Sequence, residues 1–112
     1  MKSASRTLVK SPPEVWEMLD QPERMQGLMS ALLGRATEVN VSLRDPEARL
    51  VWESMGDGER GRIEVDMNEK GWGTHVEVKA TCEREGIKLE GWLDAVMEEL
   101  STPEKRPFDG IV

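Results

Sequence analysis

The stretch that decides the fold is Gly86 to Ser101, GIKLEGWLDAVMEELS, which has the pattern of one long amphipathic helix. Its opposite face is acidic, with Glu90, Asp94 and Glu98 following one another at intervals of four residues. At about 1.5 Å per residue, such a helix is roughly 24 Å long, enough to lie across a whole small sheet. Its apolar residues share one stripe that needs a cover. They are Leu89, Trp92, Leu93, Val96, Met97 and Leu100.

Four strands are predicted directly before this helix, because apolar and polar residues alternate there with a period of two. The first, at 38–44, alternates Val39, Val41 and Leu43 with polar residues and turns at an Asp-Pro pair. The other three cover 48–55, 60–68 and 74–82. Alternation gives the sheet one dry face and one wet face, and the apolar stripe of the helix is the natural cover for the dry one.

The register of the second and third of these strands follows from Asp57-Gly58, since an Asp-Gly pair favours a two-residue type I′ hairpin loop. This loop places apolar residues opposite each other on one face and opposite charges on the other. The expected pairs are Trp52 with Ile63, Leu50 with Val65, and Glu53 with Arg62.

A second hairpin is predicted at Gly71-Trp72, where a two-residue type II′ loop fits the glycine. Its register pairs Met67 with Val76, Val65 with Val78, and Glu64 with Lys79. The same register sets Asp66 opposite Glu77, a like-charge pair, so a shifted pairing stays open.

The N-terminal part predicts a strand at 4–10 followed by two short helices. Ser11-Pro12-Pro13-Glu14 has the form of a capping box with proline in the first turn, and the helix it begins runs to about Leu19. A similar start at 20–23 opens a second helix that stops at Gly34.

Length and composition limit the possible classes of protein. We expect a single domain over 1–112, with 102–112 as a loose tail, because that segment has no periodicity. With one cysteine and one histidine there is no internal disulfide, and we expect neither a metal nor a cofactor. No apolar run is long enough to span a bilayer, so we expect a cytoplasmic protein without membrane contact. A net charge of −7 argues against nucleic-acid binding.

Three motifs resemble the START-related superfamily, also called SRPBCC, which includes polyketide cyclase-like proteins and Hsp90-ATPase activator homologues. They are SPPEVWEML at 11–19, DPEARLVWES at 45–54 and GWGTHVEV at 71–78. The resemblance covers about 5–100 and implies an α+β helix-grip fold. In that fold an antiparallel sheet, here of about five strands, carries two short helices after the first strand and one long C-terminal helix across the sheet.

The resemblance also implies a hydrophobic cavity between the sheet and the last helix. Family members with a large cavity usually have two more strands than this sequence allows, so a reduced cavity is expected. The residues that would bind a small apolar ligand there are Trp52, Val65, Met67, Val78, Trp92 and Met97. The alternative is a packed core, since apolar stripes need no ligand to explain them.

Other candidates each have a simpler interpretation. His75 falls on the wet face, where an exposed sheet histidine is more common than a general base. Cys82 falls on the dry face as a small hydrophobe. The Glu90/Asp94/Glu98 strip is either a solvated face or a docking strip for a basic partner. Trp72, at a hairpin tip, either anchors a homodimer or protein partner or folds back onto its own sheet.

The leading hypothesis is a non-catalytic START-like module that binds a small hydrophobic ligand. One alternative is a protein-interaction module similar to the Hsp90-activator homologues, acting through Trp72 or the acidic strip. A further alternative is an enzyme similar to polyketide cyclases or dehydratases. The enzyme needs a polar or ionisable side chain in the cavity, and alternation places none there on the last strands.

Overall fold

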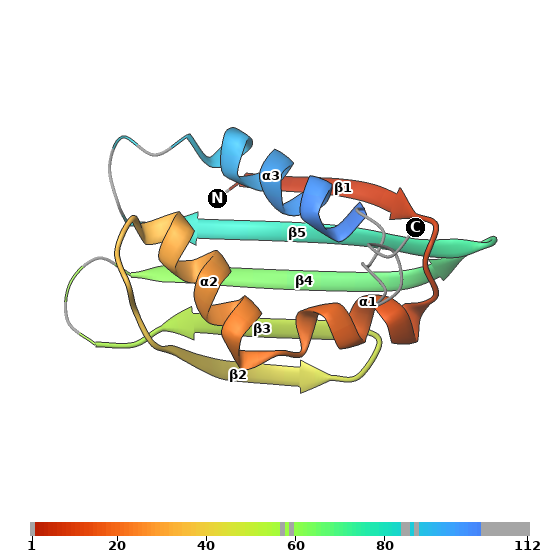
Figure 1. The fold of residues 1–112 in the computed structure, drawn as a ribbon, viewed down its shortest axis with the longest axis horizontal. Helices are drawn as coiled ribbons and strands as arrows, with labels where there is room; N and C mark the ends of the chain where they lie inside the picture. Colours follow the sequence, from red (N-terminus) through yellow and green to blue (C-terminus); the bar gives the residue numbers. More distant parts are fainter. Residues whose placement is uncertain (1, 57, 59, 84–85, 87, 102–112) are drawn as a thin grey trace, which may run out of the picture.

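A computed structural model describes residues 2–56, 58, 60–83, 86 and 88–101 (Figure 1). Five strands and three helices follow one another in the order that the sequence predicts. They are β1 (Lys2–Leu8), α1 (Pro12–Leu19), α2 (Pro22–Leu33), β2 (Val39–Asp45), β3 (Arg49–Ser54), β4 (Gly61–Lys70), β5 (Gly73–Cys82) and α3 (Leu89–Ser101). The expected tail at 102–112 lies outside the described residues.

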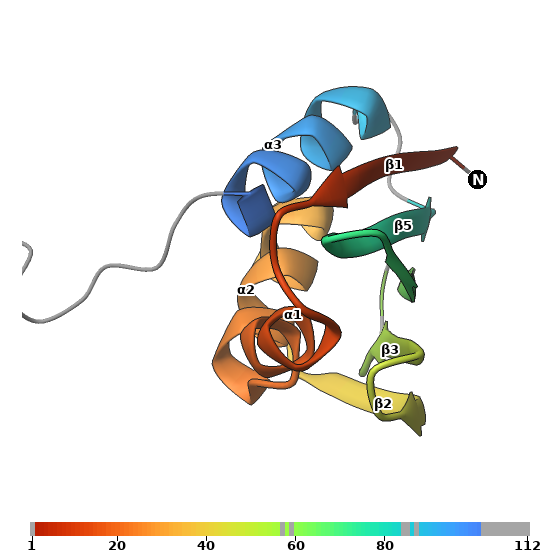
Figure 2. The same cartoon turned by 90° about the vertical axis from the view of Figure 1, so that its right-hand side faces the viewer.

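The five strands form one antiparallel sheet with the order β1-β5-β4-β3-β2. Figure 2 shows all three helices on the same side of this sheet, which leaves the other side uncovered. The α+β helix-grip arrangement is therefore confirmed, with four strands after the two short helices. Among the described residues, no helix is both long enough and apolar enough to cross a membrane.

Both predicted hairpin registers are correct. In the first, Trp52 pairs with Ile63, and the two other expected pairs also form. Asp57 lies outside the described residues, so the type of that loop is not described. In the second, Lys70 pairs with Gly73 across the two-residue loop, in which Gly71 has a φ of 58°.

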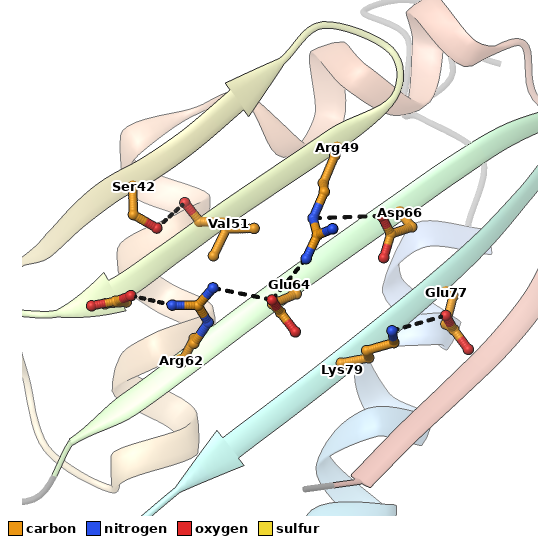
Figure 3. A network of polar contacts seen from close by, with 9 residues as sticks. Ser42, Arg49, Val51, Arg62, Glu64, Asp66, Glu77 and Lys79 are labelled. Carbon is orange, nitrogen blue, oxygen red and sulfur yellow. Dashed lines mark hydrogen bonds and ion pairs between the residues drawn. The ribbon is translucent and has the colours of Figure 1, made fainter.

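The like-charge pair of the second hairpin is present, since Asp66 does lie opposite Glu77. Each carboxylate has a cation beside it on the outer face, although Arg49 is shared between Asp66 and Glu64 (Figure 3). Arg49 Nε lies 3.6 Å from Asp66 Oδ1, and Lys79 Nζ lies 3.7 Å from Glu77 Oε1. These neighbours offset the repulsion that favoured a shifted register.

The first strand runs from Lys2 to Leu8, two residues earlier than predicted. The chain leaves the sheet after Leu8 because it must reach the start of α1, and Val9 is 93% exposed there. Thr74 Oγ1 fixes this exit by donating a hydrogen bond to the backbone oxygen of Lys10 (2.7 Å).

The predicted capping interaction is present at the start of α1. The Glu14 carboxylate accepts hydrogen bonds from the backbone N–H (3.4 Å) and the hydroxyl (3.1 Å) of Ser11.

The prediction that Leu43 shares a face with Val39 and Val41 is wrong. A bulge between Val41 and Leu43 adds one residue to β2, which reverses the side-chain alternation, and Leu43 is 43% exposed. The same reversal brings Arg44 Nη2 to within 2.9 Å of Asp20 Oδ1, at the junction of α1 and α2. The bulge thus ties the edge strand to the helical layer.

The helical cover is divided between helices. The C-terminal helix α3 packs chiefly on β1 and also contacts β5, whereas α2 lies on β2, β3 and β4. Helix α3 begins at Leu89, three residues later than predicted; Gly86 has a φ of 79°, outside the right-handed helical region, and residue 87 lies outside the described residues. The apolar stripe of α3 is buried as expected except for Leu89, which is half-buried, and α2 supplies the rest of the cover.

Two glycines give opposite predictions for stability. Gly91 lies in α3, and a Cβ added there would have no atom within 4 Å, so Gly91→Ala should stabilise the fold by roughly 0.5–1 kcal/mol. A Cβ on Gly73 would lie 1.9 Å from the backbone oxygen of Leu8, and Gly73→Ala should cost roughly 1–3 kcal/mol. Urea unfolding measures both, and equal effects would contradict the close approach of β1 to β5.

Candidate functional site

The residues predicted to bind a ligand all lie in one buried cluster between the sheet and the helices. Four come from the inner face of the sheet and two from α3. Their exposed fractions range from 0% for Trp52 to 9% for Trp92. The structure therefore brings together the predicted set, which is Trp52, Val65, Met67, Val78, Trp92 and Met97. Whether they bind a ligand stays a prediction.

Two tryptophans, one on the sheet and one on α3, donate hydrogen bonds to the backbone of α2. Trp52, on the sheet, donates its indole N–H to the backbone oxygen of Met25 (3.1 Å). Trp92, on α3, donates to the backbone oxygen of Leu28, three residues further along the same helix (3.2 Å). Both indole donors are thus satisfied inside the core, which a buried tryptophan requires. The sequence pattern predicts that both rings lie inside, but it does not identify α2 as their partner.

The core is rich in methionine. Beyond the two predicted site residues, α1 and α2 contribute three further buried methionines, which sequence reasoning did not include in the site. The buried set is Met18, Met25, Met29, Met67 and Met97. The sequence contains a signal for two of them, because Met25 and Met29 fall at the helical spacing of the apolar residues of α2; for α1 the spacing leaves the choice between Trp16 and Met18 open.

Polar side chains are scarce in this core. Among the described residues, the buried polar side chains are Thr37 and Thr74, and each donates a hydrogen bond to backbone oxygens. Neither titrates near neutral pH. Within the described residues, no group of three His, Cys, Asp or Glu side chains is placed to hold a metal ion.

His75 and Cys82 occupy the faces predicted for them. His75 is half-buried on the outer face, with Nδ1 at 3.2 Å from Thr7 Oγ1 of the neighbouring strand. Cys82 is half-buried against the core, with its Sγ at 4.0 Å from the backbone oxygen of Leu32. These contacts favour structural roles for both residues.

The outer face of the sheet carries an ion-pair network centred on Glu64 (Figure 3). Its Oε1 accepts hydrogen bonds from Arg49 Nη2 (2.9 Å) and Arg62 Nη2 (3.1 Å), and its side chain is 15% exposed. Arg62 also pairs with Glu53 through Nη1. Val51, in the same strand as Arg49 and opposite Glu64, is only 1% exposed although it belongs to this face.

Two opposing effects act on the pKa of Glu64. Burial alone would raise this pKa, but the hydrogen bonds from Arg62 and Arg49, together with the charges of both guanidinium groups, outweigh burial and lower it. A lowered pKa means that the folded state favours the ionised carboxylate. The network therefore contributes stability wherever Glu64 is ionised.

The acidic strip on α3 is not a free anionic surface. Glu90 Oε1 lies 3.1 Å from Lys2 Nζ, and Glu98 Oε1 lies 3.5 Å from Arg6 Nη1, so two of its three residues pair with β1. Asp94 forms no ion pair within the described residues. These exposed pairs contribute little individually, but they favour a role in seating α3 rather than in binding a basic partner.

Trp72 does not fold back onto its sheet. It is 99% exposed at the tip of the β4–β5 hairpin. Val9 is also exposed, and a Cβ on Gly73 would lie 3.5 Å from its Cα, so the two apolar side chains belong to neighbouring parts of the surface. The interpretation in which Trp72 folds back onto its own sheet is therefore wrong, and its side chain is exposed.

A groove of about 420 Å³ lies between α2 and α3 on the outer surface of the helical layer. Small and apolar residues of α2 contribute to its lining, and α3 contributes Glu99. Arg24 Nη1 lies 2.9 Å from Glu99 Oε1 and connects the two helices. The lining residues are Gln21, Glu23, Arg24, Gly27, Leu28, Ala31 and Glu99. Sequence reasoning did not identify this groove.

Solved structures share this fold at low sequence identity. The Mesorhizobium loti protein MLL2253 is 16% identical with a TM-score of 0.65 over 88% of this chain and 94% of its own. The Aha1 dimer from Colwellia psychrerythraea is 10% identical with a TM-score of 0.63, over 88% and 87%. CalU16 from Micromonospora echinospora is 19% identical with a TM-score of 0.56, over 90% and 75%. The chain shares its α+β helix-grip fold with these solved structures.

Comparison with protein-family models gave no match. The search of curated proteins gave no match either. At identities of 10–19%, the solved structures establish the fold and leave the activity to be argued from this chain's own residues.

A buried and an exposed tryptophan should respond very differently to substitution by alanine. Trp92→Ala removes a ring that is 9% exposed and its hydrogen bond to α2, and should cost roughly 3–5 kcal/mol of unfolding free energy. Trp72→Ala is the matched control and should change stability by less than about 0.5 kcal/mol. Urea midpoints measure both, and an unchanged midpoint for Trp92→Ala would show that α3 does not pack on the core.

The Glu64 network predicts a specific pH dependence. Because its folded pKa is lowered, its stabilisation is complete above the unfolded pKa of about 4.3 and is lost as the pH falls through the folded pKa. Wild type should therefore exceed Glu64→Gln in unfolding free energy at neutral pH, and the difference should shrink as the medium is acidified below about pH 4. A difference that is constant down to acid pH would contradict the lowered pKa.

Proposed function

We propose that the chain is a non-catalytic binding module that takes one compact apolar molecule into the core between the sheet, α2 and α3. The observation that carries the proposal is the concentration of buried methionines in this core, on α1, α2, β4 and α3. Methionine is unbranched, has three rotatable bonds and adapts to irregular apolar shapes. A core of this kind can make room by changing rotamers while its helices stay in place.

The tryptophan hydrogen bonds support a core that adapts through its side chains while its helices stay in place. Because Trp52 and Trp92 hold the backbone of α2, displacing that helix would break two buried hydrogen bonds. Repacking the side chains of Met29 or Met97 breaks none that the structure records. The space gained in this way is small, so the ligand class is a compact aromatic or short aliphatic molecule and excludes a sterol or a long acyl chain.

The polar content of the core supports a binding role over an enzymatic one. A cyclase or dehydratase needs a group that moves a proton or stabilises charge beside its substrate. The buried polar side chains among the described residues are two threonines, which already donate to backbone oxygens. The enzyme alternative therefore has less support than binding.

A second candidate function is protein interaction through Trp72. Its support is the 99% exposure of this side chain, which makes it an accessible anchor of the kind enriched at interaction hot spots. The acidic strip, the other surface suggested by the sequence, has less support because Glu90 and Glu98 pair within the chain.

Thermal shift tests the ligand proposal directly on the wild-type protein. A library of compact aromatic and short aliphatic compounds should contain binders that raise stability by about 2.7 kcal/mol at a hundredfold excess over Kd and change tryptophan fluorescence. Trp52→Leu should reduce the fluorescence response, and Met97→Ala should change the affinity. Met55→Ala, which removes a methionine that is 48% exposed, is the matched control. A library that gives no shift in the wild type contradicts the proposal.

A further inference from the structure

We propose that the hairpin tip carrying Trp72 docks into the groove between α2 and α3 of a second copy of this chain. The inference rests on the second candidate function, interaction through Trp72, and gives that interaction a partner. It is independent of ligand binding in the core.

The tip is an exposed apolar knob. Trp72 occupies a two-residue loop closed by the pairing of Lys70 with Gly73, so the ladder of β4 and β5 holds the backbone that carries it. The side chain is 99% exposed and Val9, beside Gly73, is 93% exposed. A tryptophan has few side-chain torsions to fix when a partner buries it, so a large apolar area is gained at a low entropic cost.

The groove offers an accessible surface with small and apolar residues for such a side chain. Along α2, Gly27 and Ala31 are one helical turn apart and leave the surface low, with Leu28 as an apolar floor. A Cβ on Gly27 would have no atom within 4 Å, so this part of the groove is open. Its volume is about 420 Å³, and it is open to solvent. A tryptophan side chain would bring roughly 150–250 Å² of largely apolar surface to such a site.

The charges beside the knob and on the groove rim are complementary. Lys70 precedes Trp72 by two residues, and Glu23 is one of the residues that line the groove. Neither of these two side chains forms an ion pair within the described residues, whereas the lining residues Arg24 and Glu99 pair with each other. Docking Trp72 would bring the Lys70 cation toward the Glu23 carboxylate, which favours this orientation although two copies of net charge −7 repel each other at long range.

The positions of knob and groove determine the kind of assembly. Figure 1 shows the β4–β5 tip at one end of the sheet, whereas α2 and α3 lie over its inner face. Each copy therefore presents one knob and one groove at different places, and the contact is head-to-tail. One tryptophan with its surroundings buries less area than a stable interface needs, so the association should be weak and dependent on concentration.

Two variants, each lacking one half of the contact, test the inference by sedimentation velocity over a range of protein concentrations. Wild type should associate, and Trp72→Ala, which removes the knob, should weaken association roughly thirtyfold or more. Ala31→Arg, which fills the groove, should have a similar effect. Mixed in equal amounts, the two variants should form a one-to-one heterodimer, because the first keeps its groove and the second keeps its knob.

Matched controls separate the contact from general effects. Met55→Ala removes an exposed apolar side chain elsewhere, and Gln26→Arg adds the same charge on α2 outside the groove lining; neither should change association. Lys70→Glu and Glu23→Lys should each weaken association a few-fold, and combining both reversals in one chain should restore it.

Three results would overturn the inference. A wild type that stays monomeric at the highest soluble concentration shows that copies do not dock. A wild type that associates, while the mixed variants stay monomeric, shows that the contact is not head-to-tail. If the full chain stays monomeric and a variant lacking 102–112 associates, this segment, rather than a second copy, occupies the groove of the full chain. In the first case Trp72 can still bind a different protein. Cross-linking through a photo-reactive substitution at residue 72 would detect that protein. Failure of self-docking is therefore distinguishable from failure of the interaction function.

Discussion

The hydrogen bonds from two indole groups to the backbone of α2 are the constraint on which the architecture depends. A buried indole N–H needs an acceptor, and the inner face of a sheet whose backbone groups are already paired offers few. Here the acceptors are the backbone oxygens of Met25 and Leu28, so Trp52 and Trp92 fix α2 against the sheet and α3 against α2. The sheet and the C-terminal helix are thus both anchored to one helix.

The two faces of the sheet are stabilised by different interactions. The inner face is apolar and excludes water, whereas the outer face is stabilised by charge pairs between neighbouring strands. Side-chain alternation separates the two sets, and the β2 bulge is the place where this separation is reversed. There the reversed side-chain alternation turns Arg44 toward the helices, where it forms an ion pair with Asp20. A local irregularity therefore connects the edge strand to the helical layer.

The sequence sufficed for the order of elements, both hairpin registers and the buried set because each of these depends on local periodicity and turn chemistry. It did not suffice for the bulge, since an extra residue in a strand has the same composition as a regular one. The pairing of Glu90 with Lys2 and of Glu98 with Arg6 joins residues at opposite ends of the chain, and no local pattern encodes it. The groove depends on how α2 and α3 lie together, which is a tertiary property.

The methionine content of the core makes its dense packing compatible with ligand binding. Packing of branched residues fixes their rotamers, so filling such a core leaves no freedom, whereas methionine keeps several rotamers of similar energy. In this chain the rigid elements are the tryptophans and the sheet, and most of the adaptable residues lie on the helices that cover it. Any apolar molecule that enters would therefore displace methionines and leave the hydrogen-bonded frame intact. Selection among such molecules would depend on volume and not on polar recognition, because the buried threonine hydroxyl groups among the described residues already bond to the backbone.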